Sequence, residues 1–364
     1  MDRTNKRREA VIKGFKADRV DALLVSSIPN VHYLTGFTGE DSTLLLTRER
    51  SIVLSDGRYR VQLEEECPDL EIHIRTVGQF MADAIAEVSA KLGIQRLGIE
   101  AGSFSVAEFE ELKEKRKTLE LVPLNGKVEA LRAIKDRDEI AAIREAIRFA
   151  ERAFGMLRSG LRGEDSEKDT ADALEGYLRR CGASAASFPP IVAVGPRSAL
   201  PHARPTAAMR IDQADFVLVD WGATGNPYKS DLTRVLVTGK VTPKFEKVYR
   251  TVLEAQERAI AALRPGVSAG DVDAEARSII EEAGFGRFFD HGLGHGLGLE
   301  VHEAPRLRKE SNVTLQAGMV VTVEPGIYLP GWGGIRIEDD VLITPHGCEV
   351  LTHVPKSLDS VRVA

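Results

Sequence analysis

Acidic residues interrupt apolar segments in the carboxyl-terminal two-thirds of this 364-residue chain. The segment VDWGATGNPYKSDLT contains Asp220 and Asp231, and their midpoint falls between Gly225 and Asn226. Because Gly-Asn is a two-residue hairpin turn signal, we expect the two carboxylates to lie directly opposite each other, with Cβ atoms about 4.5–5.5 Å apart. Two like charges this close repel each other, and a multivalent cation would remove the repulsion.

A second acidic pair lies in the segment VEPGIYLPGWGGIRIED, where Glu324 and Glu338 are symmetric about Gly331. Both glutamates adjoin apolar runs, and a glutamate on a half-buried strand is costly unless it is paired. We therefore expect these two carboxylates to face each other as well. Either pair alone could instead be solvent-facing acids on edge strands, but the occurrence of two such pairs argues against that alternative.

Three of the eight histidines, His291, His295 and His302, fall between the acidic pairs in the segment HGLGHGLGLEVHEAP. Four carboxylates and one imidazole would suit Mn²⁺, Co²⁺, Fe²⁺ or Zn²⁺ better than a thiophilic metal. Four negative charges balance two divalent cations, and two-metal sites with ions about 3.5–4 Å apart occur in aminopeptidases, phosphatases and nucleases. Since glycine has no Cβ, we expect the backbone of this segment to come close to metal or peptide.

The overall composition is that of an ordinary globular protein, with 43% hydrophobic and 29% charged residues. The net charge of -6 and the lack of a basic block argue against nucleic acid or an anionic membrane as a partner. The first residues are charged and do not resemble a secretory signal, and no apolar run approaches the roughly 18 residues of a membrane span. Cys67, Cys181 and Cys348 lie far apart in the sequence, which fits a reducing compartment, so we expect a cytoplasmic protein.

The first third alternates short β-branched segments with helical ones, which indicates a mixed α/β domain. We expect strands at 21–27, 43–47, 51–55, 71–76, 96–100 and 119–124, and helices at 80–93 and 105–117.

The remaining sequence repeats the order of helix, helix and strands, which indicates two similar halves that share one core. The first helix is expected to begin with a capping box formed by Asp136 and Glu139. We expect helices at about 136–158, 166–181, 242–263 and 269–283. Strands are expected at 190–195, 215–223, 232–239, 298–303, 319–329 and 334–344.

Four segments of this second region, 219–235, 294–305, 322–328 and 334–344, resemble the two-metal peptidases of the pita-bread fold. The most similar members are aminopeptidase P and Xaa-Pro dipeptidase (prolidase). Segment 187–206 resembles their substrate loop, and NVHYLTGFTGEDSTLLLT with LSDGRYR resembles their creatinase-type N-terminal domain. The resemblance implies an α/β (α+β) chain, with a creatinase-like domain at 1–127 and a pita-bread metallopeptidase domain at 128–364.

The resemblance also assigns roles to individual residues. It implies two divalent metal ions, Mn²⁺ in the first place and Co²⁺, Zn²⁺ or Fe²⁺ as alternatives, with Asp231 and Glu338 bridging both. The complete ligand set that it implies is Asp220, Asp231, His295, Glu324 and Glu338. The catalytic and substrate-facing set that it implies is His202, His291, His302, Glu324 and Arg336. Glu324 would move protons, and His291 and His302 would donate hydrogen bonds to the oxygen that gains charge.

Plainer interpretations exist for the residues of the pocket. His202 could be an ordinary loop histidine, His291 could pack near a helix end, and His302 could be merely exposed. Arg336 lies two residues before Glu338 and hence on the same strand face, so it could be a structural counter-charge.

The predicted activity is metal-dependent hydrolysis of the Xaa-Pro bond at the amino terminus of peptides, as in an Xaa-Pro aminopeptidase. An Xaa-Pro dipeptidase, restricted to dipeptides, is the alternative, and a non-catalytic pita-bread module that binds peptides is a further one. Methionine aminopeptidases share the ligands but generally lack the N-terminal domain, and creatinase lacks the ligands. HGLGHGLG is not a phosphate loop, because Leu299 stands where G-x-G-x-x-G needs glycine. The expected partners are proline-containing peptides and a second copy of the chain in a homodimer.

Overall fold

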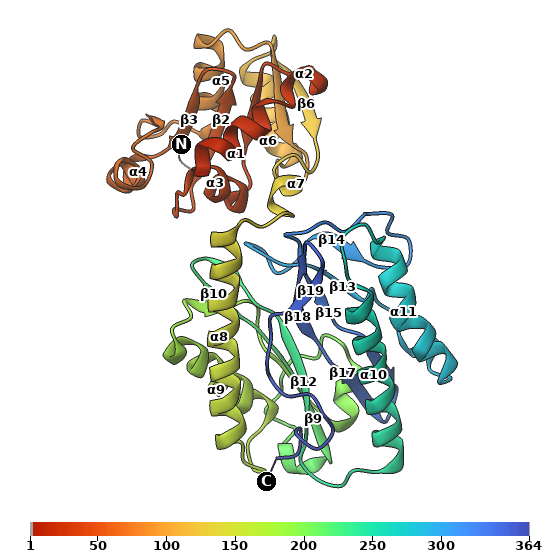
Figure 1. Cartoon of the computed structure of the whole chain (residues 1–364). Helices are drawn as coiled ribbons and strands as arrows, with labels where there is room; N and C mark the ends of the chain where they lie inside the picture. Colours follow the sequence, from red (N-terminus) through yellow and green to blue (C-terminus); the bar gives the residue numbers. More distant parts are fainter. Residues whose placement is uncertain (1–2, 364) are drawn as a thin grey trace. The chain divides into compact units, whose positions relative to one another are not determined.

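The computed structural model describes residues 3–363, which divide into two compact units between Arg132 and Ala133 (Figure 1). The sequence predicted this boundary between residues 127 and 128.

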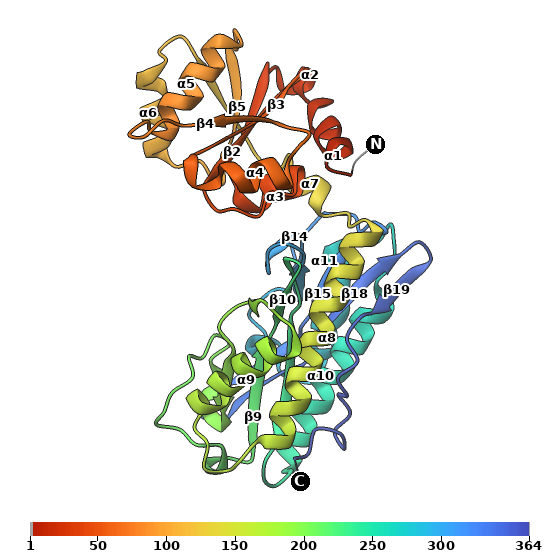
Figure 2. The same ribbon diagram turned by 90° about the vertical axis from the view of Figure 1, so that its left-hand side faces the viewer.

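The first unit is built around one mixed sheet with the strand order β4-β3-β2-β1-β5-β6. Its strands are β1 (Ala22–Val25), β2 (Ser42–Thr47), β3 (Ser51–Ser55), β4 (Glu71–Ile74), β5 (Arg96–Glu100) and β6 (Glu120–Leu124). Its helices are α1 (Arg3–Ile12), α2 (Phe15–Asp18), α3 (Ile28–Thr35), α4 (Arg60–Glu66), α5 (Met81–Lys91), α6 (Val106–Lys115) and α7 (Glu129–Arg132). Figure 2 shows α5 and α6 to one side of this sheet and α1 to the other. The mixed α/β organisation predicted for this region is confirmed.

The second unit contains two pairs of long helices that pack against strands lying between them (Figure 1). The helices are α8 (Arg137–Gly160), α9 (Glu167–Cys181), α10 (Pro243–Ala262) and α11 (Ala269–Glu282). Asp136 caps α8, accepting hydrogen bonds from the N–H groups of Asp138 and Glu139, while the Glu139 side chain accepts one from the N–H of Asp136. The predicted helix pairs and the capping box are therefore confirmed.

The strands of the second unit fall into two groups that follow the two helix pairs along the chain. The first group is β7 (Ala185–Ala186), β8 (Ile191–Val194), β9 (Phe216–Trp221), β10 (Ala223–Gly225), β11 (Tyr228–Lys229) and β12 (Leu232–Val237). The second group is β13 (Gly294–Gly296), β14 (Glu303–Leu307), β15 (Val320–Val323), β16 (Gly326–Leu329), β17 (Gly333–Arg336), β18 (Asp339–Thr344) and β19 (Gly347–Val350). The sheet orders are β12-β9-β8, β11-β10-β7, β14-β13-β15-β18-β19 and β16-β17.

Two apolar clusters fill the space between these helices and strands. One joins α8 and α9 to β8, β9 and β12, and in it the rings of Phe154 and Trp221 stack with centroids 4.2 Å apart. The other joins α10 and α11 to the second group of strands and also includes residues of β9 and β12. Because helices cover one side of each group, the acidic residues between the groups are held on strands with a packed apolar backing.

Candidate metal centre

The first acidic hairpin has a different register from the predicted one. Gly225 pairs with Tyr228, so the turn is formed by Asn226 and Pro227, and Asn226 takes the positive φ of 54° that this turn requires. Asp220 consequently pairs with Thr233 and is not directly opposite Asp231. The prediction was wrong by two residues because it placed the turn one residue too early.

The second acidic hairpin has the predicted register. Gly326 pairs with Arg336 in β16–β17, and Val323 pairs with Asp339 in β15–β18. Both pairings are symmetric about Gly331, which has a φ of 78°. Glu324 therefore lies between β15 and β16, and Glu338 lies between β17 and β18, at positions that are symmetric about Gly331 as predicted.

The glycine-rich histidine segment contains a short strand with irregular backbone on both sides. His295 lies in β13, where a Cβ on Gly294 would stand 2.1 Å from the carbonyl oxygen of Thr322 and a Cβ on Gly296 would stand 2.1 Å from that of Ala304. Because these two glycines have no side chain, the backbones of the neighbouring segments can lie close to them. We had expected them to allow the close approach of a metal or a peptide. The predicted strand at 298–303 was also wrong, since regular pairing resumes only at Glu303, after His302.

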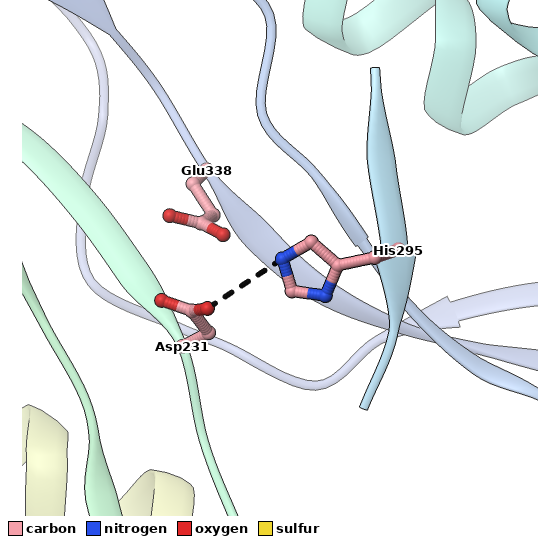
Figure 3. Close-up of side chains that lie close together, drawn as sticks. All are labelled: Asp231, His295 and Glu338. Carbon is pink, nitrogen blue, oxygen red and sulfur yellow. Dashed lines mark ion pairs between the residues drawn. The ribbon is translucent and has the colours of Figure 1, made fainter. Parts of the chain in front are cut away.

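Three of the five predicted ligands converge in the second unit. One ligand atom from each of Asp231, His295 and Glu338 lies within 4.8 Å of the others, and all three residues are buried. Figure 3 shows the two carboxylates and the imidazole pointing toward one another from separate segments. The His295 Nε2 atom is 3.8 Å from the Asp231 carboxylate. Asp231 precedes β12 and Glu338 precedes β18, so the cluster joins the two halves of the unit.

The other two predicted ligands lie at the edge of this group. The Glu324 Oε1 atom is 3.3 Å from His295 Nε2, and its carboxylate also accepts a weak hydrogen bond of 3.4 Å from the Thr322 hydroxyl. Asp220 lies on β9, and its Oδ2 atom accepts a hydrogen bond of 2.5 Å from Arg336 Nη2. The structure therefore brings all five residues to one buried region, with Arg336 paired to Asp220.

The electrostatics of this region fit a bound cation. Burial, and after it the charges of Glu338 and Asp220, raises the pKa of Asp231 well above its ordinary value. Burial, followed by the charges of Glu324 and Asp220, does the same to the pKa of Glu338. Among the described residues, the buried Oδ1 atom of Asp220 finds no hydrogen-bond partner. A divalent cation would satisfy that oxygen and oppose the repulsion between the carboxylates.

Glu324 differs from the other carboxylates of the group. Burial alone would raise its pKa, but the hydrogen bond with His295, together with the electrostatic influence of His295, His291 and Arg336, outweighs burial and lowers the pKa of Glu324 to about 2. The alternative that the acidic residues of this site face solvent is wrong for Asp231 and Glu338, because these residues are only 5% and 2% exposed.

A tyrosine connects Arg336 to His291. The Tyr328 hydroxyl accepts a hydrogen bond of 2.8 Å from Arg336 Nη1 and lies 3.0 Å from His291 Nε2. His291 Nδ1 lies 2.7 Å from the carbonyl oxygen of Gly292, so Nδ1 carries the proton and Nε2 of the neutral ring accepts from Tyr328. Burial lowers the pKa of His291 and favours the neutral ring. In this arrangement both ring nitrogens are engaged, which leaves no donor for a substrate oxygen.

His302 and His202 line the same cavity from outside the ligand cluster. The His302 ring meets that of His295 edge-on, with centroids 4.4 Å apart, and burial, followed by the electrostatic influence of His295 and Arg306, lowers the pKa of His302 to about 4. His202 lies in the loop that follows a short 3₁₀ helix at Gly195–Ala199, and its side chain is exposed at the cavity wall.

The cavity has a volume of about 1330 Å³ and combines apolar and basic walls. Phe188, Pro189 and Pro190 are among its apolar lining residues. Its basic lining residues, apart from Arg336, are Arg204, Arg287, Arg306 and Arg308, all with exposed side chains. The cavity thus offers both apolar surface and positive charge next to the carboxylate cluster.

Two hydroxyl residues of the site were not predicted from the sequence. The Thr233 hydroxyl donates a hydrogen bond of 2.6 Å to Glu338 Oε2 and accepts one of 3.1 Å from Arg336 Nε. Thr233 follows Asp231 by two positions, so strand periodicity could have placed both on one face. Tyr328 carries a hydroxyl in the apolar run GIYL, and burial raises its pKa to about 12. A buried hydroxyl in such a run needs a partner, which is the signal that could have found it.

Fold and site together define a two-domain metallopeptidase with a pita-bread catalytic unit. The sequence profile of metallopeptidase family M24 matches residues 141–345, and that of the creatinase/prolidase N-terminal domain matches residues 7–134. The chain therefore belongs to metallopeptidase family M24. The predicted family, fold class and metallopeptidase activity are confirmed.

Full-length similarity to individual proteins agrees with this membership. The chain is 37% identical to a protein named Xaa-Pro dipeptidase from Pyrococcus horikoshii, over 98% of this chain and 100% of the other. A solved structure of an Xaa-Pro dipeptidase from Bacillus anthracis superposes with a TM-score of 0.94 at 38% identity, covering 98% of this chain and 99% of the other. The structure of an X-Pro aminopeptidase from Thermotoga maritima gives a TM-score of 0.86 at 36% identity, covering 95% and 99%.

The helices of residues 3–363 include none with the length and apolar character needed to cross a membrane.

Proposed function

We propose that this protein is an Xaa-Pro dipeptidase that depends on divalent metal ions. The observation that carries the choice of dipeptides is the set of exposed arginines on the cavity wall, namely Arg204, Arg287, Arg306 and Arg308. A dipeptide bound at the carboxylate cluster ends in a free carboxylate one residue after the scissile bond, and guanidinium groups pair well with carboxylates. Longer peptides carry that charge further away. The similarity to proteins named Xaa-Pro dipeptidase over their full length supports the same choice.

We further propose that Asp220, Asp231, His295, Glu324 and Glu338 hold two divalent ions, with Mn²⁺ as the first candidate and Co²⁺, Zn²⁺ or Fe²⁺ as alternatives. The buried, partnerless Asp220 oxygen and the raised pKa values of Asp231 and Glu338 support this set. Such ions, when bound, lower the pKa of water and polarise the carbonyl of the scissile bond.

The residues around the ions would then bind substrate and move protons. The Glu324 carboxylate, which is ionised and lies 3.3 Å from His295 Nε2, would take a proton from the attacking water and pass it to the leaving proline nitrogen. His302 would donate a hydrogen bond to the carbonyl oxygen as that oxygen gains charge. Arg336 and Tyr328 would keep Asp220 in place. The walls formed by Phe188, Pro189 and Pro190 would exclude water from the pyrrolidine ring.

An Xaa-Pro aminopeptidase is the second candidate. The similarity to an X-Pro aminopeptidase and a cavity of about 1330 Å³, which could admit a third residue, favour it. A non-catalytic peptide-binding module has less support, because the complete set of carboxylates and His295 is present.

The experiment that separates these candidates compares Ala-Pro with Ala-Pro-Ala as substrates for protein that has been stripped with a chelator and reloaded with Mn²⁺ or Co²⁺. A dipeptidase cleaves Ala-Pro with a kcat/KM at least tenfold above that for Ala-Pro-Ala. A preference for Ala-Pro-Ala identifies an aminopeptidase. Binding of Ala-Pro without cleavage by either reloaded form identifies a binding module.

A further inference from the structure

The segment from Val194 to Thr206 forms one wall of the cavity. Pro201, His202 and Ala203 line the cavity from this segment. The wall touches the site through Arg336, whose two terminal nitrogens lie 3.4 Å from the Pro201 carbonyl oxygen. Val194 ends β8 and Gly195–Ala199 form the short 3₁₀ turn, but residues 200–206 have no regular secondary structure, so side-chain contacts also help to hold them in place.

A buried glutamate outside the cavity makes contacts with both ends of this wall. Glu167 is the first residue of α9 and is 0% exposed. Its Oε1 atom accepts a hydrogen bond of 2.9 Å from the Val194 N–H, and its Oε2 atom accepts one of 3.1 Å from the Thr206 N–H. One carboxylate therefore closes a segment whose ends are twelve residues apart in sequence.

The same carboxylate also reaches the middle of the wall through Arg197. Arg197 Nε lies 2.9 Å and 2.8 Å from the two Glu167 oxygens, and Arg197 Nη2 donates a hydrogen bond of 2.6 Å to the Arg204 carbonyl oxygen. The backbone reinforces the closure, because the Glu167 N–H donates to the Met209 carbonyl oxygen at 2.9 Å. Glu167 and Arg197 thus form a clamp on the wall.

The clamp is chemically specific to a carboxylate. Each oxygen of Glu167 faces N–H donors only, so an amide in its place would turn an NH₂ group toward a donor. The position also suits a negative charge, since it is the first turn of a helix. The chemistry of the metal site does not require this glutamate. Its burial next to the cavity wall is therefore explained by the contacts through which it supports that wall.

We propose that Glu167 is a positioning residue that holds the 194–206 segment, and with it His202, against the substrate cavity. This proposal rests on the proposed function, because it assigns the wall to substrate binding. Glu167 acts through Arg197 and the backbone, and it touches neither the metal ligands nor the substrate.

The test compares Glu167→Gln with Glu175→Gln, a control that changes an exposed glutamate on the same helix. We expect Glu167→Gln to raise KM for Ala-Pro about tenfold, the effect of losing one hydrogen bond to a charged group, and to change kcat and metal content less than twofold. Hydrogen exchange of the amides of residues 195–206 should be at least tenfold faster in Glu167→Gln than in wild type. Glu175→Gln should match wild type in all four measurements.

A second variant guards against poor folding of the first. Arg197→Gln removes the ion pair with Glu167 and the link to the Arg204 carbonyl but leaves the two backbone contacts of Glu167, and the Arg197 side chain is 32% exposed. It should raise KM by a smaller factor, about threefold, and speed exchange mainly near residue 204.

Several results would overturn the proposal. Unchanged KM and unchanged hydrogen exchange in both Glu167→Gln and Arg197→Gln would do so. Faster hydrogen exchange spread evenly over the second unit would also do so, because it would indicate that Glu167 stabilises the whole unit. A proportional loss of metal content would mean that Glu167 supports the metal site instead. If the wild-type protein cleaves no Xaa-Pro peptide, the proposed function fails, while the exchange data still decide whether the clamp exists.

Discussion

Replacement of Thr233 by valine would test whether the hydroxyl that contacts Glu338 helps to build the metal centre. Valine keeps the branched shape of threonine but removes the donor to Glu338 Oε2 and the acceptor for Arg336 Nε. Thr233 is 0% exposed, so water cannot replace the lost hydroxyl. The two remaining groups would both be left buried with one contact fewer.

The expected magnitude follows from these two contacts. A buried polar group that loses its partner costs about 1–3 kcal/mol. The total for Glu338 and Arg336 is smaller than twice this cost, because each side chain keeps other polar atoms that can still form contacts. We expect Thr233→Val to lower the free energy of unfolding by about 2 kcal/mol. A partner that orients a ligand typically contributes about 10- to 100-fold to metal affinity or activity, so we expect a loss of that size in Mn²⁺ affinity.

Mn²⁺ affinity is measured by calorimetric titration of chelator-stripped protein with Mn²⁺. The free energy of unfolding is measured by urea unfolding monitored by tryptophan fluorescence. Both tryptophans, Trp221 and Trp332, lie in the second unit, so the fluorescence transition reports on that unit alone. Thr233→Ser is the matched control, because it keeps the hydroxyl and should retain Mn²⁺ affinity within about threefold. Wild-type Mn²⁺ affinity in Thr233→Val would refute the reasoning.

Three further predictions concern the cluster and its scaffold. Glu338→Ala should abolish stoichiometric metal binding and reduce kcat/KM at least a thousandfold, and elemental analysis showing two ions per chain would contradict the role assigned to it. Gly296→Val should lower the free energy of unfolding by at least about 2 kcal/mol, because its Cβ would stand 2.1 Å from the Ala304 carbonyl oxygen; an unchanged urea midpoint would show that β13 can move. Asp339→Asn should cost about 3–5 kcal/mol, because it leaves the buried Arg234 guanidinium without its charge partner at 2.7 Å. A loss below about 1 kcal/mol in the fluorescence transition would mean that the neighbouring donors and acceptors compensate.

Local features of the fold could be predicted from the sequence. The helix pairs follow from apolar periodicity, and the start of α8 follows from its capping box, because both depend on residues within one or two helical turns. The register of the second hairpin could be predicted for the same reason, since Gly331 marks a turn that only a residue with positive φ forms easily.

The first hairpin shows where local signals fail. Gly225 and Asn226 fit a turn as well as Asn226 and Pro227 do, and the packing of the flanking strands decides between the two. A two-residue difference in register keeps every side chain on the same face, so the alternation of apolar residues could not distinguish them. The prediction for the glycines of β13 was wrong for a similar reason. The strands that lie close to these glycines, β14 and β15, come from elsewhere in the sequence.

The sequence by itself determined the residue types of the site and the elements that carry them. Its apolar runs interrupted by acids required partners for those acids, and its motifs identified the family. Only the tertiary structure decided which groups meet: that Thr233 contacts Glu338, that Tyr328 links Arg336 to His291, and that Glu167 contacts both ends of the cavity wall. These contacts join residues on strands and helices that are distant along the chain. Their geometry depends on how whole elements pack, which no short window of sequence contains.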